Sequence, residues 1–390
     1  MKITTTTSAL IAATSIVQSA VAGGDEANLP SHFLFRVVEG ALHILASNGK
    51  RLLASACVEG ATIEGDPSSF TVSAWRFGQL LRLKLGTSAA VLEFDETIAS
   101  TRVNLGGRTI RLASLDPSQF NYWDATFANT QVTATVKAGR LFEALNYLRP
   151  FVSTLDTRTP GLAATECREG TLLATDTHSV ASVKVAGLAN STLRIHFSDI
   201  PAVNAFLGLA NDIDITIREH DSTIFFVRPD GGVFGVSRWV HAFPNMKIDQ
   251  ASKASFTVDA ENLRFGLRFL ATASAKDDDK VRFDFRDNKV VLSVKNAVTG
   301  TDKAAKGDPN AQEWREEFEL DTKALNNIGA LSEIGRSSFD LSTTHITAIL
   351  DLVSEATVTF QVNWTPKNGY ILYKNVVDGD EYVTIAVWRK

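Results

Sequence analysis

Cys167, Asp176 and His178 are side chains of the types used in nucleophilic catalysis, and they lie close together in the sequence. A thiol nucleophile needs a base within hydrogen-bond reach and a third group that orients this base. Asp176 and His178 are separated by one residue within a segment of turn-forming residues, and no pattern places Cys167 beside them. We therefore interpret these residues as structural and expect no nucleophilic catalysis.

A second group of reactive side chains is the charged segment Lys276-Asp277-Asp278-Asp279-Lys280. Its carboxylates could bind a cation, but a short run of mixed charge is typical of a solvated loop. Phosphate-loop, dinucleotide-binding, zinc-protease and nucleophile-elbow motifs do not occur in the sequence. The two cysteines, Cys57 and Cys167, have no disulfide or metal-site spacing and favour a reducing compartment. The sequence predicts a protein that is not an enzyme and that needs neither cofactor nor metal.

The composition of the 390-residue chain fits a folded protein of roughly two to four domains. Hydrophobic residues make up 44% and charged residues 21%, which allows a large core and an ordinary polar surface. The 23 phenylalanines against 2 methionines indicate an aromatic, β-rich core. A net charge of −5 argues against binding nucleic acid over the whole surface, but it allows basic residues to gather on one face.

A strand followed by an amphipathic helix occurs three times, at intervals of roughly 125 residues. The predicted strands are Lys2–Thr6, Thr130–Val136 and Ser255–Asp259, and Asp259 is a good helix N-cap. The later helices show apolar stripes at helical spacing, namely Leu141, Leu145 and Leu148 in one and Leu263, Leu267 and Leu270 in the other.

The second half of each repeat has the same plan. Strands are predicted at Phe70–Ser73, Ile195–Ser198 and Phe318–Asp321, and each is expected to lead directly into a helix. In the third repeat this helix would contain Leu325, Ile328 and Leu331. The pattern predicts an α+β fold of three tandem domains, residues 1–125, 126–250 and 251–390, each with two helices and antiparallel sheets.

The N-terminus allows two interpretations. An apolar run from Ala9 to Ala22 ends in Ala20-Val21-Ala22, which resembles a signal-peptidase site and would indicate a secreted, β-rich structural or adhesive protein. The run is interrupted by polar residues, and Lys2 is the one positive charge before it. The alternative is the first strand and helix of the repeat, which we favour, and no other apolar run could span a bilayer.

The segment Ala174-Thr175-Asp176-Thr177-His178-Ser179-Val180 resembles the hairpin A-T-D-G-H-R-L of bacterial sliding clamps, the β subunit of DNA polymerase III. The junctions Ser114–Phe120 and His241–Asn245 resemble the family's domain ends, and Tyr382–Trp388 resembles its terminal strand. Together with the threefold repeat, the resemblance covers the whole chain.

Several features depart from the family pattern. Thr177 and Ser179 replace the usual Gly and Arg, the chain ends in Trp388-Arg389-Lys390, and 296–313 reads as a lengthened polar loop. Such divergence fits a phage-encoded clamp or a distant cellular one.

The resemblance implies a cytoplasmic homodimer of crescents that closes head to tail into a ring around double-stranded DNA, with no membrane contact. Sequence-independent sliding requires cations near phosphates on the helices that line the hole. The candidate residues are Arg76, Arg82, Lys84, Lys137, Arg140, Arg149, Arg158, Arg264 and Arg268.

Two further surfaces follow from the resemblance. DNA polymerase and clamp loader would dock through a short peptide motif in an apolar groove. The groove would be lined by Leu162, Thr175, His178, Val180, Pro244, Met246, Ile385, Val387 and Trp388. The ring contact would join an edge strand that carries Ile110 and Leu112 to Phe269 and Leu270 of the third domain.

Overall fold

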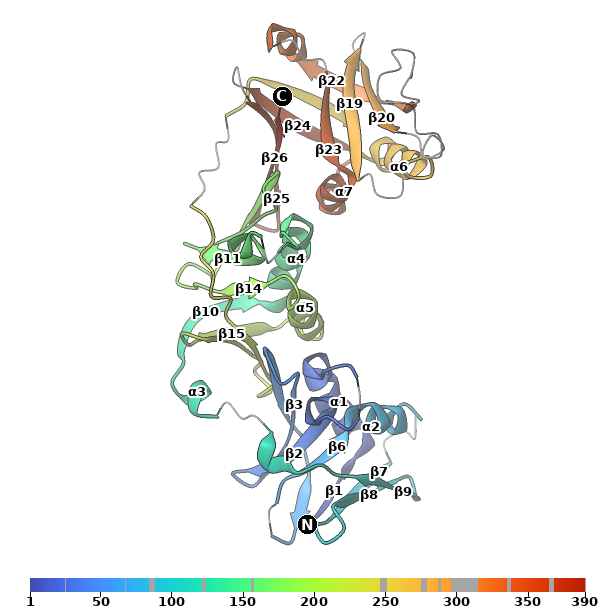
Figure 1. Cartoon of the computed structure of the whole chain (residues 1–390), viewed down its shortest axis with the longest axis vertical. Helices are drawn as coiled ribbons and strands as arrows, with labels where there is room; N and C mark the ends of the chain where they lie inside the picture. The colour runs from blue at the N-terminus through green and yellow to red at the C-terminus, as the bar shows by residue number, and fades with distance from the viewer. Residues whose placement is uncertain are drawn as a thin grey trace. The chain divides into compact units, whose positions relative to one another are not determined.

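The computed structural model describes the whole chain except residues 25, 67, 84–87, 121–123, 156–157, 246–250, 275–278, 287–288, 296–314, 335–337, 365–367 and 390 (Figure 1). The chain forms two compact units. Unit 1 consists of Met1–Leu145, Glu166–Gly170 and Ala186–His241, and unit 2 consists of Asn146–Thr165, Thr171–Val185 and Ala242–Lys390. Each unit therefore contains more than one repeat, and the three-domain division of the sequence stays a prediction.

Unit 1 contains two antiparallel sheets. The first has the order β5 (Thr62–Glu64), β1 (Lys2–Thr6), β7 (Ala89–Asp95), β8 (Ser100–Leu105), β9 (Arg108–Ala113). The second has the order β10 (Gln131–Lys137), β15 (Asp214–Glu219), β16 (Thr223–Val227), β17 (Val233–Ser237), β4 (Leu52–Cys57), β3 (Ala41–Ser47), β2 (His32–Val38), β6 (Phe70–Ser73). Strands from the first two repeats thus share one sheet through the pair β17–β4.

The described helices of this part of the chain are α1 (Thr7–Val17), α2 (Ala74–Leu81), α3 (Asp124–Ala128), α4 (Ala138–Leu148) and α5 (Ile200–Gly208). All except α3 begin within two residues of the end of a predicted strand. The short strands β11 (Ala164–Arg168) and β14 (Arg194–His196) are hydrogen-bonded neighbours in a sheet.

Unit 2 also contains two antiparallel arrays of strands. In one, neighbouring strands follow the order β12 (Thr171–Thr175), β13 (Ser179–Lys184), β26 (Asp380–Arg389), β25 (Asn368–Val377), β24 (Thr357–Trp364), β18 (Ala254–Asp259), β22 (Thr322–Asn326). The other has the order β21 (Arg315–Leu320), β20 (Lys289–Lys295), β19 (Lys280–Arg286), β23 (Ser338–Ser342). Its α-helices are α6 (Ala260–Ala271) and α7 (Thr343–Asp351).

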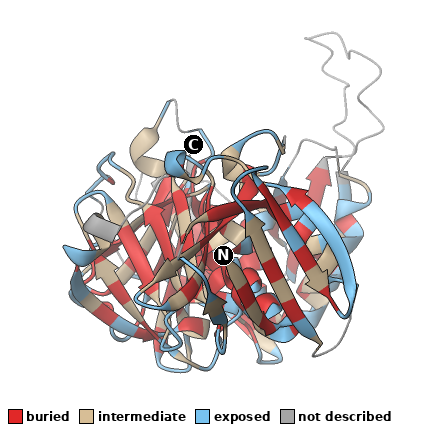
Figure 2. Cartoon of the chain, turned by 90° about the horizontal axis from the view of Figure 1, so that it is seen from below, coloured by how far each residue is buried: buried red, intermediate tan, exposed pale blue. Residues whose placement is uncertain are grey.

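Aromatic side chains form much of the core, as the composition predicts. In unit 2, the Phe256 ring stacks on Phe360 at 5.1 Å and also contacts Phe283 and Phe339. Figure 2 shows buried residues running along the strands and on the helix faces that cover them. Alternation along the strands places one face of each sheet in this core.

The N-terminal segment is an integral part of unit 1. Strand β1 pairs with β5 on one side and β7 on the other. Ile3 and Leu10 are completely buried, and Thr6 caps α1 by accepting a hydrogen bond from the Ala9 amide. Removing residues up to Ala22 would take out a central strand, so the structure opposes the signal-peptide interpretation. In the described part of the chain, no helix has the length and apolar character needed to cross a membrane.

One predicted helix is wrong. The segment with Leu325, Ile328 and Leu331 forms strand β22 and then a 3₁₀ helix, Ile328–Ile334. The register pairs Leu325 with Phe256 of β18, so cross-strand packing decides the conformation there. The helix lies later in the chain, at α7, where Ser342 accepts a hydrogen bond from the His345 amide at 3.3 Å.

Candidate functional sites

The hairpin β12–β13 brings three of the predicted groove residues into one row. Thr175 pairs with Val180, and Val180 pairs with Ile385 of β26. Directly paired residues of antiparallel strands project from the same face of a sheet. Ile385 packs in a small cluster with Leu372 and Val383. These three residues are therefore neighbours across three strands of unit 2, with Thr175 and Ile385 buried and Val180 half-buried.

Two segments that carry further predicted groove residues, Leu162 and Pro244, lie next to each other. A Cβ added at Gly161 would lie 2.2 Å from the carbonyl oxygen of Ala242, so the two backbones are in close contact. This contact places the half-buried Leu162 close to the segment that carries Pro244, which is exposed. A side chain at position 161 would force the segments apart.

The structure describes the remaining predicted groove residues only in part. His178 is exposed in the hairpin turn. Val387 and Trp388 pair through their backbones with Tyr370 and Gly369, and their side chains lie outside the described part. Met246 also lies outside the described residues.

The sequence prediction missed His345, a buried residue of α7 that contacts the hairpin turn. Its Nδ1 lies 2.9 Å from Ser179 Oγ, its Nε2 lies 3.1 Å from the Pro150 carbonyl oxygen, and Phe151 stacks on the ring at 4.4 Å. Burial lowers the pKa of His345, although Asp176 opposes the shift. Residue type alone gives no signal for this role, because a single histidine on an apolar helix face is common in cores.

The predicted DNA-contacting residues occupy several kinds of position. Arg82, Arg149, Arg158 and Arg268 are exposed, whereas Lys84 lies outside the described residues. Arg76 pairs with Glu26 at 2.6 Å. Lys137 is the last residue of strand β10, not a helix residue, and it pairs with Asp214 at 3.2 Å. Arg140 lies half-buried near the start of α4.

Arg264 has a structural role. Its Nη2 donates to the carbonyl oxygens of Leu350 and Val353 at 2.6 and 2.8 Å, at the C-terminal end of α7. The Leu350 carbonyl oxygen also accepts from the Val353 amide at 3.0 Å, so the guanidinium adds a charged donor at the end of the helix where the helix dipole favours a positive charge. The geometry therefore favours a helix cap over a phosphate contact at this position.

The predicted ring-contact residues divide into exposed and buried members. Ile110 lies on β9, the outermost strand of its sheet among the described strands, and is 43% exposed, while Leu112 is buried. Phe269 is 48% exposed and packs with Phe318 of β21, while Leu270 is buried in the core of its own unit. Leu112 and Leu270 thus contribute to folding, whereas Ile110 and Phe269 are exposed.

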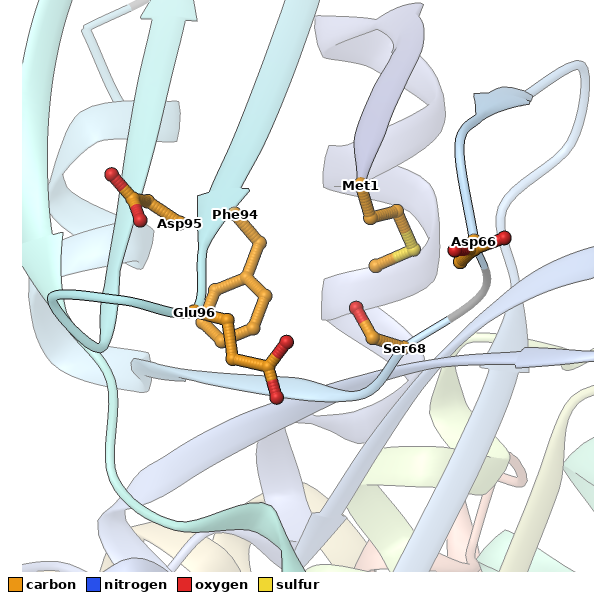
Figure 3. Close-up of a pocket in the computed structure, with 6 residues that line it drawn as sticks. All are labelled: Met1, Asp66, Ser68, Phe94, Asp95 and Glu96. Carbon is orange, nitrogen blue, oxygen red and sulfur yellow. The ribbon is translucent and has the colours of Figure 1, made fainter.

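A hollow of about 500 Å³ lies in unit 1, beside Met1 and Phe94 (Figure 3). Its wall carries the carboxylates of Asp66, Asp95 and Glu96. These charges would repel phosphate, so the hollow is unsuited to DNA. Among the described residues, no group of His, Cys, Asp and Glu side chains could hold a metal ion.

The structure resembles solved sliding clamps over the full chain. The DNA polymerase III β subunit of Thermotoga maritima aligns with a TM-score of 0.76 and 17% identity, covering 100% of this chain and 99% of that chain. The sliding clamp of Bacillus subtilis gives 0.76 and 15% over the same shares. The Pseudomonas aeruginosa clamp bound to griselimycin gives 0.75 and 16%, covering both chains completely.

The chain has the sliding-clamp fold. No protein-family model matches the sequence, and no curated protein matches it either. The low identity explains both results, because a fold is retained through hydrophobic pattern and strand register after most side chains have changed. The predicted fold class, an α+β clamp, is confirmed by these structural matches.

Proposed function

We propose that this protein is a DNA sliding clamp that encircles duplex DNA and tethers a replicative polymerase. The observation that carries the proposal is the match to clamp structures over 100% of the chain, with no part of the fold left over. Tethering raises the effective concentration of polymerase at the primer end without any chemical step. We accordingly propose a binding protein, not an enzyme, that acts in the cytoplasm.

DNA contact would come from exposed basic side chains without base-specific readers. Arg82, Arg149, Arg158 and Arg268 are exposed and could reach phosphate oxygens. Each contact releases counterions, so affinity should fall steeply with salt. A net charge of −5 keeps such binding weak unless the duplex is enclosed.

Two copies would close the ring by joining β9 of one copy to β21 of the other. The described part of each sheet leaves these strands with one unpaired edge. Arg108 and Arg111 are exposed on β9, and Glu316, Glu317 and Glu319 are exposed on β21. Glu317 pairs with Arg286 at 2.8 Å and Glu319 with Lys289 at 2.7 Å within the same sheet, so a head-to-tail contact would let Arg108 and Arg111 share these carboxylates.

The apolar part of this contact would lie next to the charges. Ile110 of β9 would meet Phe265, Phe269 and Phe318, which form one aromatic cluster on α6 and β21. Phe265 and Phe269 are 59% and 48% exposed, which is unusual for side chains of this size. Burying them against a second copy would remove this apolar surface from water.

Polymerase and clamp loader would bind the row Thr175, Val180 and Ile385 through a short peptide. Val180 is half-buried, whereas Thr175 and Ile385 are buried, so the proposed contact is one anchoring side chain at Val180. We propose Leu162 and Pro244 as the edges of the groove. Griselimycin, the ligand held by the Pseudomonas aeruginosa and Bartonella birtlesii clamps, is a practical probe for this groove.

The deciding experiment combines solution mass with retention on DNA. Light scattering should give a mass near twice 42.3 kDa. After incubation with nicked circular plasmid, protein should remain on the circles through a high-salt wash and leave when a restriction enzyme linearises them. Salt removes electrostatic contacts but cannot undo a topological link. A monomer at all concentrations would contradict the ring, whereas a dimer that is lost equally from circles and linear DNA would point to another role of the clamp fold or to a missing loader.

A further inference from the structure

The turn of the β12–β13 hairpin contains a strained residue. Thr177 has φ +82°, in the left-handed region that β-branched residues rarely adopt. Such strain persists only where the surroundings fix the backbone, and it is concentrated at functional sites. The turn lies between Thr175 and His178, both residues of the proposed peptide groove.

Side chains within the turn provide part of this support. Asp176 Oδ1 accepts hydrogen bonds from the backbone amides of His178 and Ser179, at 2.9 and 2.7 Å. Thr175 Oγ1 donates to the Ser179 carbonyl oxygen at 2.7 Å. These bonds close the turn locally but do not connect it to the rest of unit 2.

His345 makes that connection. The Pro150 carbonyl oxygen can only accept, so Nε2 carries a proton and donates to it at 3.1 Å. In the neutral ring, Nδ1 then accepts from the Ser179 hydroxyl, over 2.9 Å. The second Asp176 oxygen, Oδ2, lies 3.5 Å from Nε2. The His345 ring thus contacts Asp176 and Ser179 of the turn and links them to Pro150, which follows α4.

We propose that His345 is a positioning residue of the peptide groove, which holds the strained Asp176–Ser179 turn so that Thr175 and His178 keep the geometry a partner peptide requires. The inference rests on the proposed function for the identity of the groove. The anchoring of the turn by His345 can be tested without a partner.

The anchor should depend on pH. Ionisable groups that act on His345 are Asp176 and His178 from the turn and Asp279 from the segment before β19. Burial lowers the pKa of the ring below its ordinary value of 6.5, so the neutral form predominates near neutrality. Protonation places a hydrogen on Nδ1, which then donates to the Ser179 hydroxyl, and it adds a positive charge 3.5 Å from Asp176 Oδ2, so the exchange of the turn should change as the pH falls through the pKa of His345.

The test is hydrogen exchange of the His178 and Ser179 amides in the full-length protein. We expect His345→Ala to raise their exchange about tenfold, because an unanchored turn opens locally more often. Thr347→Ala, an exposed change on the same helix, should leave them unchanged. His345→Gln covers the case in which the alanine variant fails to fold, and it should abolish the pH dependence of the exchange, after correction for the intrinsic rate.

A second variant tests the role of strain. Glycine adopts positive φ without strain, so Thr177→Gly should restore protection in the His345→Ala background. Equal exchange in wild type and both His345 variants, or a Thr177→Gly substitution that leaves the exchange of His345→Ala unchanged, would overturn the proposal.

The affinity for griselimycin tests whether the conformation of the turn affects binding in the proposed groove. It should weaken about tenfold in His345→Ala and remain unchanged in Thr347→Ala. If wild-type protein does not bind griselimycin, the proposed groove is contradicted, while the exchange data still decide whether His345 anchors the turn.

Discussion

Arg264 and Arg268 lie one turn apart on α6 but have different surroundings. Arg264 donates to the Leu350 and Val353 carbonyls, and Arg268 is exposed. We expect Arg264→Ala to lower the free energy of unfolding by about 2 kcal/mol, as charged hydrogen bonds are lost. Arg268→Ala should change it by less than about 0.5 kcal/mol.

For DNA binding, we expect the substitution of Arg268 to have the larger effect and the substitution of Arg264 the smaller one. Arg268→Ala should reduce the slope of log affinity against log salt by about 1, as expected for one phosphate contact. Arg264→Gln, which removes the charge, should leave that slope unchanged. A lower slope in Arg264→Gln together with an unchanged slope in Arg268→Ala would reverse our assignment.

Glu219 is a buried carboxylate with several donors in unit 1. Burial alone would raise its pKa, but hydrogen bonds from Ser191, Arg238, Thr133 and Thr192 hold the pKa below the usual 4.5. Arg238 Nη2 lies 2.5 Å from Oε2. Glu219→Gln should destabilise unit 1 by about 3 kcal/mol, because it leaves a largely buried guanidinium without its counter-charge.

The contribution of Glu219 to folding stability should decrease as the pH falls. A carboxyl whose pKa is lower in the folded state adds stability above its unfolded pKa, and this stability is lost as the pH falls through the folded pKa. Thermal melting of the wild type should therefore decline more steeply below about pH 4.5 than that of Glu219→Gln. Parallel curves for the two proteins would contradict the assignment.

At the scale of elements, the segment with Gly161 contacts the segment with Ala242 through the backbone, beside the predicted groove residues Leu162 and Pro244. Gly161→Ala would place a Cβ 2.2 Å from the Ala242 carbonyl oxygen, and overpacking of this kind costs about 1–3 kcal/mol. We expect a lower melting temperature and weaker griselimycin binding. Gly78→Ala in α2 is the matched control, because nothing lies within 4 Å of the added Cβ. It should raise stability by about 0.5–1 kcal/mol, the usual gain in a helix.

Assembly of the whole molecule should depend on charge at the two strand edges. Replacing Arg108 and Arg111 by Glu makes both edges of a copy acidic, and replacing Glu317 and Glu319 by Arg makes both basic. Each variant alone should be monomeric, because like charges would face each other. A mixture should recover a mass near twice 42.3 kDa, measured by light scattering.

The mixture also serves as its own control for misfolding, because unfolded variants could not complement each other. Dimers formed by either variant alone would show that these charges do not face each other. If the wild type is also monomeric, the ring itself is contradicted. Salt should weaken the wild-type contact through screening of the same pairs.

Local signals in the sequence determined much of the fold. β1 runs from Lys2 to Thr6 as predicted, and Asp259 caps α6 through the Asn262 amide at 2.8 Å. Apolar periodicity and capping residues act within a few positions along the chain, so they can be read without tertiary information. The repeat and the resemblance of the hairpin then predicted the clamp fold, and they placed Thr175, Val180 and Ile385 on one surface.

The tertiary structure decided the features that depend on distant partners. Residues 322–326 became strand β22 because β18 offers a pairing edge, although their apolar spacing suggested a helix. Arg264 became a helix cap and His345 an anchor because α7 brings carbonyls and a hairpin turn within reach of them. A hydrogen bond requires its two heavy atoms to lie about 3 Å apart, and only the folded chain brings these partners so close. Residue type and spacing in the sequence therefore could not reveal these roles.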